Sequence, residues 1–194
     1  MRNLFTAAAL AVLLPATAHA QEADPRVDDV VETSDGYKCR AHEMPELSLS
    51  HDWRGADRGA IWEGRAREAG AGDYRIRVAF HPQEDRPSVA APALLGFEFN
   101  MPRTPLRAPA KSAHLRLDGI ADATPLQLEG DPTYLSLAVA ERQREELAQR
   151  LMAVSIVEID LVDASGAPLG RYSWDIRRLR RSNEVLQVIN WSCR

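Results

Sequence analysis

Apolar and polar residues alternate along most of this chain, with the period of two that is typical of half-buried β-strands. The clearest case lies at residues 74–80, where Tyr74, Ile76 and Val78 alternate with Arg75 and Arg77. The same period predicts further strands over residues 47–53, 60–67, 95–100, 114–118, 126–128 and 135–139. The pattern therefore indicates a mainly β protein.

One helical segment interrupts the strands, and a hairpin follows it. Residues 141–152 lack glycine and proline and are rich in helix formers, which predicts a helix. Residues 157–161 and 172–176 alternate on either side of a turn at 163–168, which predicts a hairpin. A short closing helix is expected over 184–190, with Asn183 as its cap.

These elements predict a single antiparallel β-sandwich or partly open barrel, with one connecting helix and a short C-terminal helix. We expect this β-rich domain to span residues 37–194. Prolines cluster at 82–92 and 102–109, which we interpret as surface loops within the domain. A division into two domains near residue 105 is the alternative, because domain boundaries favour such segments.

The first twenty residues have the pattern of a secretory signal peptide. Arg2 precedes an apolar run from Leu4 to Leu14, and Ala18-His19-Ala20 offers a cleavage site. A second site after Ala18 is also compatible with the pattern. The run is shorter than the about 20 residues that a membrane span needs, so we expect cleavage and a mature chain without a transmembrane segment. Residues 21–36 are acidic and predict a flexible lead-in.

Composition and charge narrow the function classes. Hydrophobic residues make up 45% of the chain and charged residues 27%, which is ordinary for a globular domain. The formal net charge is −4 and becomes −5 when Arg2 is removed with the signal peptide. A nucleic-acid-binding protein would carry a strong basic surplus, so the charge argues against that class.

The export signal decides how the two cysteines are interpreted. Cys39 and Cys193 lie near the two ends of the predicted domain. Because disulfides persist outside the cytosol, we expect them to pair and to tie these ends together. Two free thiols, or pairing with another chain, remain the alternatives. We expect the protein to be periplasmic or secreted.

The sequence contains none of the established catalytic or phosphate-binding motifs, so we assign no catalytic residue, no cofactor and no metal. His42, Met44 and His51 could form a copper or zinc site, but their spacing fits no tight ligand pattern. His51 and Asp52 could combine with acids such as Glu63 and Asp73, although an acidic chain offers such pairs by chance.

A dense basic run lies near the C-terminus and consists of Arg177, Arg178, Arg180 and Arg181. One interpretation is a contact patch for an acidic partner or an anionic envelope surface. The other is a solvated face that flanks the apolar Ile176 and Leu179. The tryptophans are most simply core or rim aromatics, unless several gather on the surface as a binding groove.

The C-terminal half resembles the periplasmic invasion-associated locus B family. The similar stretch runs from Leu115-Arg-Leu-Asp-Gly119 through the predicted helix to Asp163-Ala-Ser-Gly166 and Tyr172-Ser-Trp174. The chain departs from the family where Glu129-Gly-Asp-Pro-Thr-Tyr134 replaces an expected cysteine pair. The resemblance implies a small exported all-β protein with a flanking helix and no established enzyme activity.

Together these features predict a non-enzymatic exported protein that binds a partner protein or another envelope component. A small-ligand or metal carrier, with copper or zinc as the metal, is the alternative. A hydrolase with an unrecognised site is the third possibility.

Overall fold

The computed structural model describes residues 27–34, 36–41, 44–52, 58–67, 72–80 and 91–188. In its first half the strands are β1 (Val27–Thr33), β2 (Gly36–Ala41), β3 (Met44–Asp52), β4 (Arg58–Arg65), β5 (Asp73–Phe80) and β6 (Leu94–Asn100). In its second half they are β7 (Ser112–Leu117), β8 (Ile120–Asp122), β9 (Leu126–Asp131), β10 (Tyr134–Val139), β11 (Ile156–Val162) and β12 (Pro168–Asp175). The helices are α1 (Glu141–Leu151) and α2 (Arg177–Val188). Within these ranges, neither helix is long and apolar enough to cross a membrane.

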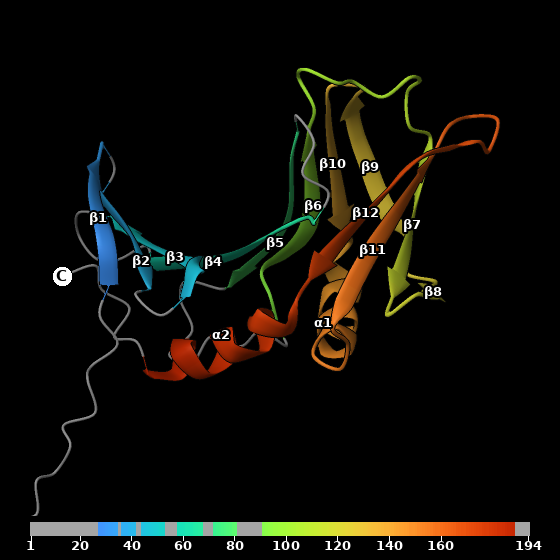
Figure 1. Cartoon of the computed structure of the whole chain (residues 1–194). Coiled ribbons are helices and arrows are strands. Elements are labelled where there is room, and N and C mark those ends of the chain that lie inside the picture. Colours follow the sequence, from blue (N-terminus) through green and yellow to red (C-terminus); the bar gives the residue numbers. More distant parts are fainter. Residues whose placement is uncertain are drawn as a thin grey trace, which may run out of the picture.

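The strands form two antiparallel sheets. Sheet A has eight strands in the order β1-β2-β3-β4-β5-β6-β10-β9, and sheet B has four in the order β12-β11-β7-β8. Sheet B packs against the β5–β6–β10–β9 end of sheet A and meets the end of β4 through β12, while β1–β3 extend beyond it (Figure 1). The sheets do not close into a barrel, and the mainly β, sandwich-like prediction is confirmed.

Aromatic side chains from both sheets form the centre of the sandwich. Trp174 of β12 is fully buried and lies 5.3 Å and 5.7 Å from Phe97 and Phe99 of β6, measured between ring centroids. Its indole Nε1 donates a hydrogen bond of 3.3 Å to the carbonyl oxygen of Tyr74 on β5. A backbone bridge between Ala66 and Trp174 joins the end of β4 to β12. The two sheets are therefore joined by packing and by backbone hydrogen bonding at the same place.

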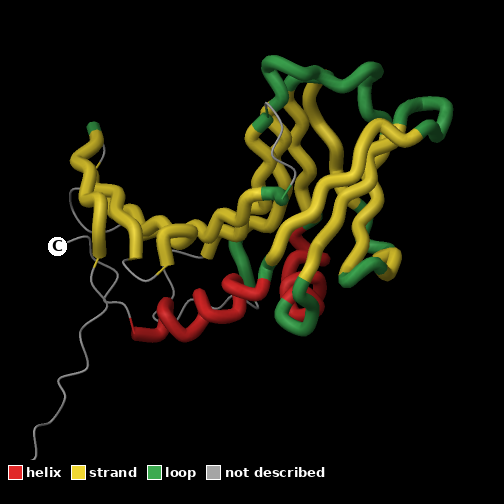
Figure 2. The backbone as a smooth tube through the Cα atoms, in the orientation of Figure 1, coloured by secondary structure: helices red, strands yellow, loops and turns green. Residues whose placement is uncertain are grey.

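The two helices cover different parts of the strands. Helix α1 lies at one end of the sandwich, whereas α2 runs below the part of sheet A that sheet B leaves uncovered (Figures 1 and 2). Leu147 and Leu151 of α1 are buried in the core. At the start of α2, Ile176, Leu179 and Ser182 are buried, so this helix contributes its own side chains to the core.

The closing helix begins earlier than predicted, at Arg177 instead of residue 184. Four arginines near a helix N-terminus oppose the helix dipole, which made this segment an unfavourable place to start a helix. The structure supplies a compensating acid, since Asp175 Oδ1 accepts a hydrogen bond of 3.1 Å from the backbone N–H of Arg177. Arg177 lies in the first turn, where backbone donors lack partners within the helix.

The predicted lead-in is wrong over residues 27–33, which form β1 and pair with β2. The acids in this segment suggested a solvated tail, but an edge strand is held by backbone hydrogen bonds and can carry charged residues. Residues 21–26 lie outside the described residues. The strands β2 and β8 were also not predicted.

Cys39 lies on β2 and is 2% exposed, and the described part of the chain contains no free cysteine. Cys193 lies outside the described residues, so pairing between the two remains a prediction. We expect that alkylation of the mature protein without reductant modifies neither cysteine, and that mass measurement shows two alkylated cysteines only after reduction. Two alkylated thiols in the unreduced sample would contradict the disulfide.

The predicted disulfide between Cys39 and Cys193 should also increase the free energy of unfolding. For a loop of this length, the chain-entropy model gives the disulfide about 4–5 kcal/mol of the free energy of unfolding. A Cys39→Ala/Cys193→Ala variant should therefore unfold at a lower urea concentration than the oxidised wild type. The reduced wild type is the matched control, because it keeps both side chains and lacks only the bond.

Candidate functional site

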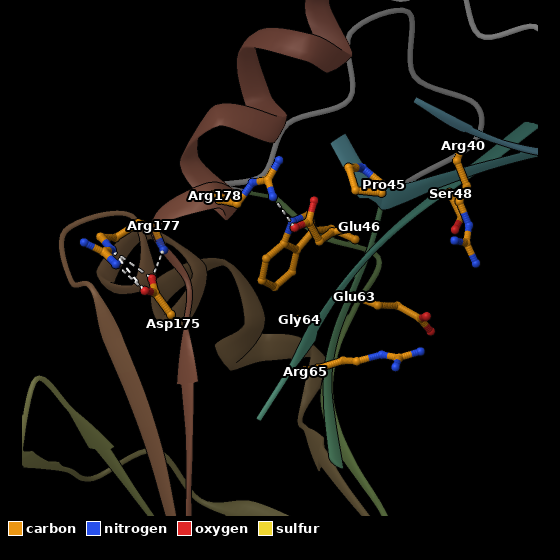
Figure 3. A pocket seen from close by; sticks show the side chains of 11 residues that line it. Arg40, Pro45, Glu46, Ser48, Glu63, Gly64, Arg65, Asp175, Arg177 and Arg178 are labelled. Atoms are coloured by element: carbon orange, nitrogen blue, oxygen red, sulfur yellow. Dashed lines mark hydrogen bonds and ion pairs between the residues drawn. The ribbon is translucent and has the colours of Figure 1, made fainter. Parts of the chain in front are cut away.

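A cavity with a volume of about 630 Å³ lies between β2–β4 and the start of α2. Figure 3 shows Arg177, Arg178 and Asp175 on one side, and Arg40, Ser48, Glu63 and Arg65 on the other. The remaining lining residues are Pro45, Glu46, Trp62 and Gly64. We call this cavity the arginine pocket, because four of its lining residues are arginines.

The pocket forms where two strands stop pairing. The register of β3 and β4 ends at Leu47 and Trp62, although β4 continues to pair with β5 as far as Arg65. Successive side chains of a strand point to opposite faces, so Trp62 and Gly64 lie on one face of β4 and Glu63 and Arg65 on the other. Because the ladder opens here, residues from both faces line one cavity.

The start of α2 contributes two of the arginines. Arg177 Nε lies 2.9 Å from Asp175 Oδ1, and Arg178 Nη1 lies 2.6 Å from Glu46 Oε1 on β3. Arg67 adds a second cation to Asp175, at 3.1 Å. These pairs place negative charge at the positive end of the helix dipole, which stabilises the helix start. The pair of Arg178 and Glu46 also joins α2 to β3 across the pocket.

The acids of the pocket are all engaged by arginines. Glu63 Oε1 lies 3.0 Å from Arg77 Nε and its Oε2 lies 3.3 Å from Arg75 Nη1, both on β5. The side chains of Arg40 and Arg65 are exposed and make no side-chain hydrogen bond or close ion pair within the described residues, although Arg65 interacts electrostatically with Asp73. Positive charge therefore exceeds negative charge around the pocket, and two guanidinium groups are available to a ligand.

The predicted arginine run divides into two parts. Arg177 and Arg178 line the pocket, whereas Arg180 and Arg181 are exposed on α2 and do not line it. Ile176 and Leu179 are buried, as the alternative interpretation of this run expected.

The histidines do not come together as a site within the described residues. Met44, one of the metal-ligand candidates, is fully buried in the hydrophobic core. His42 and His81 lie outside the described residues, and the structure does not describe the side chain of His51. Among the described residues, no group of three or more His, Cys, Asp or Glu side chains is arranged to bind a metal ion. Glu63 and Asp73, considered for acid–base chemistry, pair with arginines.

The sequence did not identify Arg40, Arg65, Glu46 or Trp62 as site residues. They come from three strands, and Glu46 is separated from its partner Arg178 by 132 positions. No local spacing marks such a set, because the register of β2, β3 and β4 brings it together. The only local feature of the sequence that indicated this site was the run of arginines that includes Arg177 and Arg178.

No family model, no curated protein and no solved structure matches this chain.

The carboxyl of Asp175 should make stability depend on pH. Hydrogen bonds from Arg177, and further ones from Arg67, hold the pKa of Asp175 well below its usual range. A lowered folded-state pKa stabilises the protein above the unfolded value of about 3.9, and this contribution is lost as the pH falls below it.

Asp175→Asn should therefore lower the free energy of unfolding at pH 7 by about 1 kcal/mol, the usual size for a partly exposed acid at a helix start. The difference from wild type should shrink below about pH 4, because wild-type Asp175 then becomes protonated as well. Urea unfolding at several pH values measures both effects. Glu129→Gln, which neutralises an exposed acid on β9, is the control and should leave the free energy of unfolding unchanged. A constant difference for Asp175→Asn across the pH range would contradict the assignment.

Proposed function

We propose that this chain is an exported, non-enzymatic protein of the cell envelope that binds an acidic segment of a partner protein in the arginine pocket. The signal-peptide pattern of residues 1–20 and the resemblance to the invasion-associated locus B family support export to the periplasm. The pocket supports the binding role.

The observation that carries this proposal is the excess of positive charge at the pocket. Its acids Glu46, Glu63 and Asp175 are each paired with an arginine, so they leave Arg40 and Arg65 available. Guanidinium groups bind carboxylates with two parallel hydrogen bonds, and such charge-assisted bonds are stronger than neutral ones. An acidic segment would supply the carboxylates.

The exposure of these cations favours a macromolecular partner. Arg40 and Arg65 extend from the strand side of the pocket, on the side opposite Arg177 and Asp175 (Figure 3), and both are exposed. Exposed charges also accelerate encounters with a partner of opposite sign, and this steering weakens as salt screens it. Binding at this surface should therefore be salt-dependent.

A small carboxylate ligand is the second candidate. The cavity of about 630 Å³ lies within the range of about 300–1,000 Å³ that is typical of small-molecule sites. The same arginines would bind such a ligand, so competition between the two kinds of ligand separates the candidates.

A fluorescently labelled hexaglutamate peptide should bind the mature protein, and binding should weaken as salt rises. The Arg40→Gln/Arg65→Gln variant should bind it about tenfold more weakly, since two exposed ion pairs contribute about 0.2–1 kcal/mol each and 1.4 kcal/mol is tenfold. Fluorescence anisotropy at two salt concentrations measures both effects.

Arg103→Gln is the matched control, because Arg103 is an exposed arginine of the β6–β7 loop that does not line the pocket. It should bind hexaglutamate as the wild type does. Displacement of the peptide by citrate at equal carboxylate concentration would favour the small ligand. Equal binding of hexaglutamate and hexalysine, or no effect of the double substitution, would refute the proposal.

A further inference from the structure

Two polar atoms of the arginine pocket are buried and lack hydrogen-bond partners among the described residues. The side chain of Trp62 is 1% exposed, and its indole Nε1 has no acceptor. Glu46 uses Oε1 to bind Arg178, whereas its Oε2 is buried without a donor. Buried polar groups are nearly always hydrogen-bonded in native proteins, so an unpaired donor and an unpaired acceptor at one cavity call for an explanation.

The neighbouring glycine determines where the indole lies. A Cβ atom on Gly64 would lie 2.6 Å from Trp62 Cη2 and 2.9 Å from Ile76 Cγ2, closer than atoms can approach. Gly64 therefore leaves the space into which the Trp62 ring folds on the same face of β4. Trp62 and Gly64 are both lining residues, so this packing holds the indole at the wall of the pocket.

Glu46 lines the same pocket from β3. It precedes Leu47, the residue of β3 at which pairing with β4 ends, so it lies where the ladder opens. The contact of 2.6 Å with Arg178 engages Oε1 of the Glu46 carboxylate and leaves Oε2 without a donor among the described residues. Trp62 and Glu46 thus contribute one unpaired N–H donor and one unpaired oxygen acceptor to the lining of the pocket.

We propose that Trp62 and Glu46 recognise the main chain of the bound peptide. The indole N–H donates to the carbonyl oxygen of one peptide residue, and Glu46 Oε2 accepts from the N–H of the same residue. In an extended segment these two groups point to the same side, whereas the C=O and N–H of a single trans amide point in opposite directions. This inference rests on the proposed function, in which Arg40 and Arg65 bind carboxylates of the same peptide. Arg40 and Arg65 select acidic side chains, whereas Trp62 and Glu46 select the main chain of a peptide.

Trp62→Phe tests the donor, because it removes the N–H and keeps an aromatic ring. The variant should bind labelled hexaglutamate about tenfold more weakly than the wild type, the usual size for one buried hydrogen bond. Its resistance to urea should fall, because a smaller ring replaces a buried indole and leaves a cavity. A purely structural role for Trp62 would lower the stability and leave the affinity of the folded protein for hexaglutamate unchanged.

Trp174→Phe is the matched control. It also removes a buried indole N–H, but one that donates to the Tyr74 carbonyl oxygen away from the pocket. This variant should lose stability and keep its affinity for hexaglutamate. Both variants should lose stability, but only Trp62→Phe should weaken binding, so the comparison separates binding from stability.

A backbone-methylated hexaglutamate tests the acceptor, because it keeps every carboxylate and lacks amide N–H groups. It should bind the wild type more weakly than hexaglutamate does, and its affinity should not depend on Glu46. Failure of the wild type to bind hexaglutamate would overturn the proposed function. Binding of hexaglutamate that neither Trp62→Phe nor backbone methylation weakens would overturn only the main-chain recognition and leave the charge-based proposal in place.

Discussion

The packing of Trp174 between the two sheets is the interaction on which the arrangement of this protein depends. Its ring is buried against Phe97 and Phe99, and its Nε1 donates to the Tyr74 carbonyl oxygen. A buried tryptophan removes about 150–250 Å² from water, so this contact is a large part of the sheet-to-sheet interface. Trp174 also precedes Asp175 and α2 directly. The buried Trp174 therefore anchors the end of β12 directly before the start of α2, whose first residues line the pocket.

The start of α2 shows how an unfavourable local sequence becomes stable in the folded protein. Arginines at Arg177 and Arg178 stand at the positive end of the helix dipole, where cations are destabilising. Asp175 from β12 and Glu46 from β3 pair with them and reverse this effect. Asp175 and Glu46 therefore line the pocket with their charges already paired to arginines. Arg40 and Arg65 are the lining arginines that remain available to a ligand.

The sequence predicted the parts of the fold that depend on local patterns. The alternation in residues 74–80 and 157–161 predicted β5 and β11, and helix formers at 141–152 predicted α1. It missed β1, whose acidic residues suggested a solvated tail, because backbone pairing with β2 leaves no local apolar signal. The beginning of α2 was missed for a related reason, since its compensating partner Glu46 is remote in sequence.

The candidate site was predictable only in part. Arg177 and Arg178 were expected as contact residues from their local density. Arg40, Arg65 and Trp62 reach the pocket through strand register and through the opening of the β3–β4 ladder at Leu47 and Trp62. Register depends on pairings between distant segments, which a single sequence does not reveal. The outer strands of sheet A, β1 and β9, affect how copies of the protein meet. Within the described residues, β1 and β9 are the outermost strands of an eight-stranded sheet, and such edges favour association between copies. The sequences of both strands are acidic, with Asp28, Asp29 and Glu32 on one and Glu129 and Asp131 on the other. Two copies that met edge to edge would bring like charges together, so these acids oppose aggregation through the sheet edges.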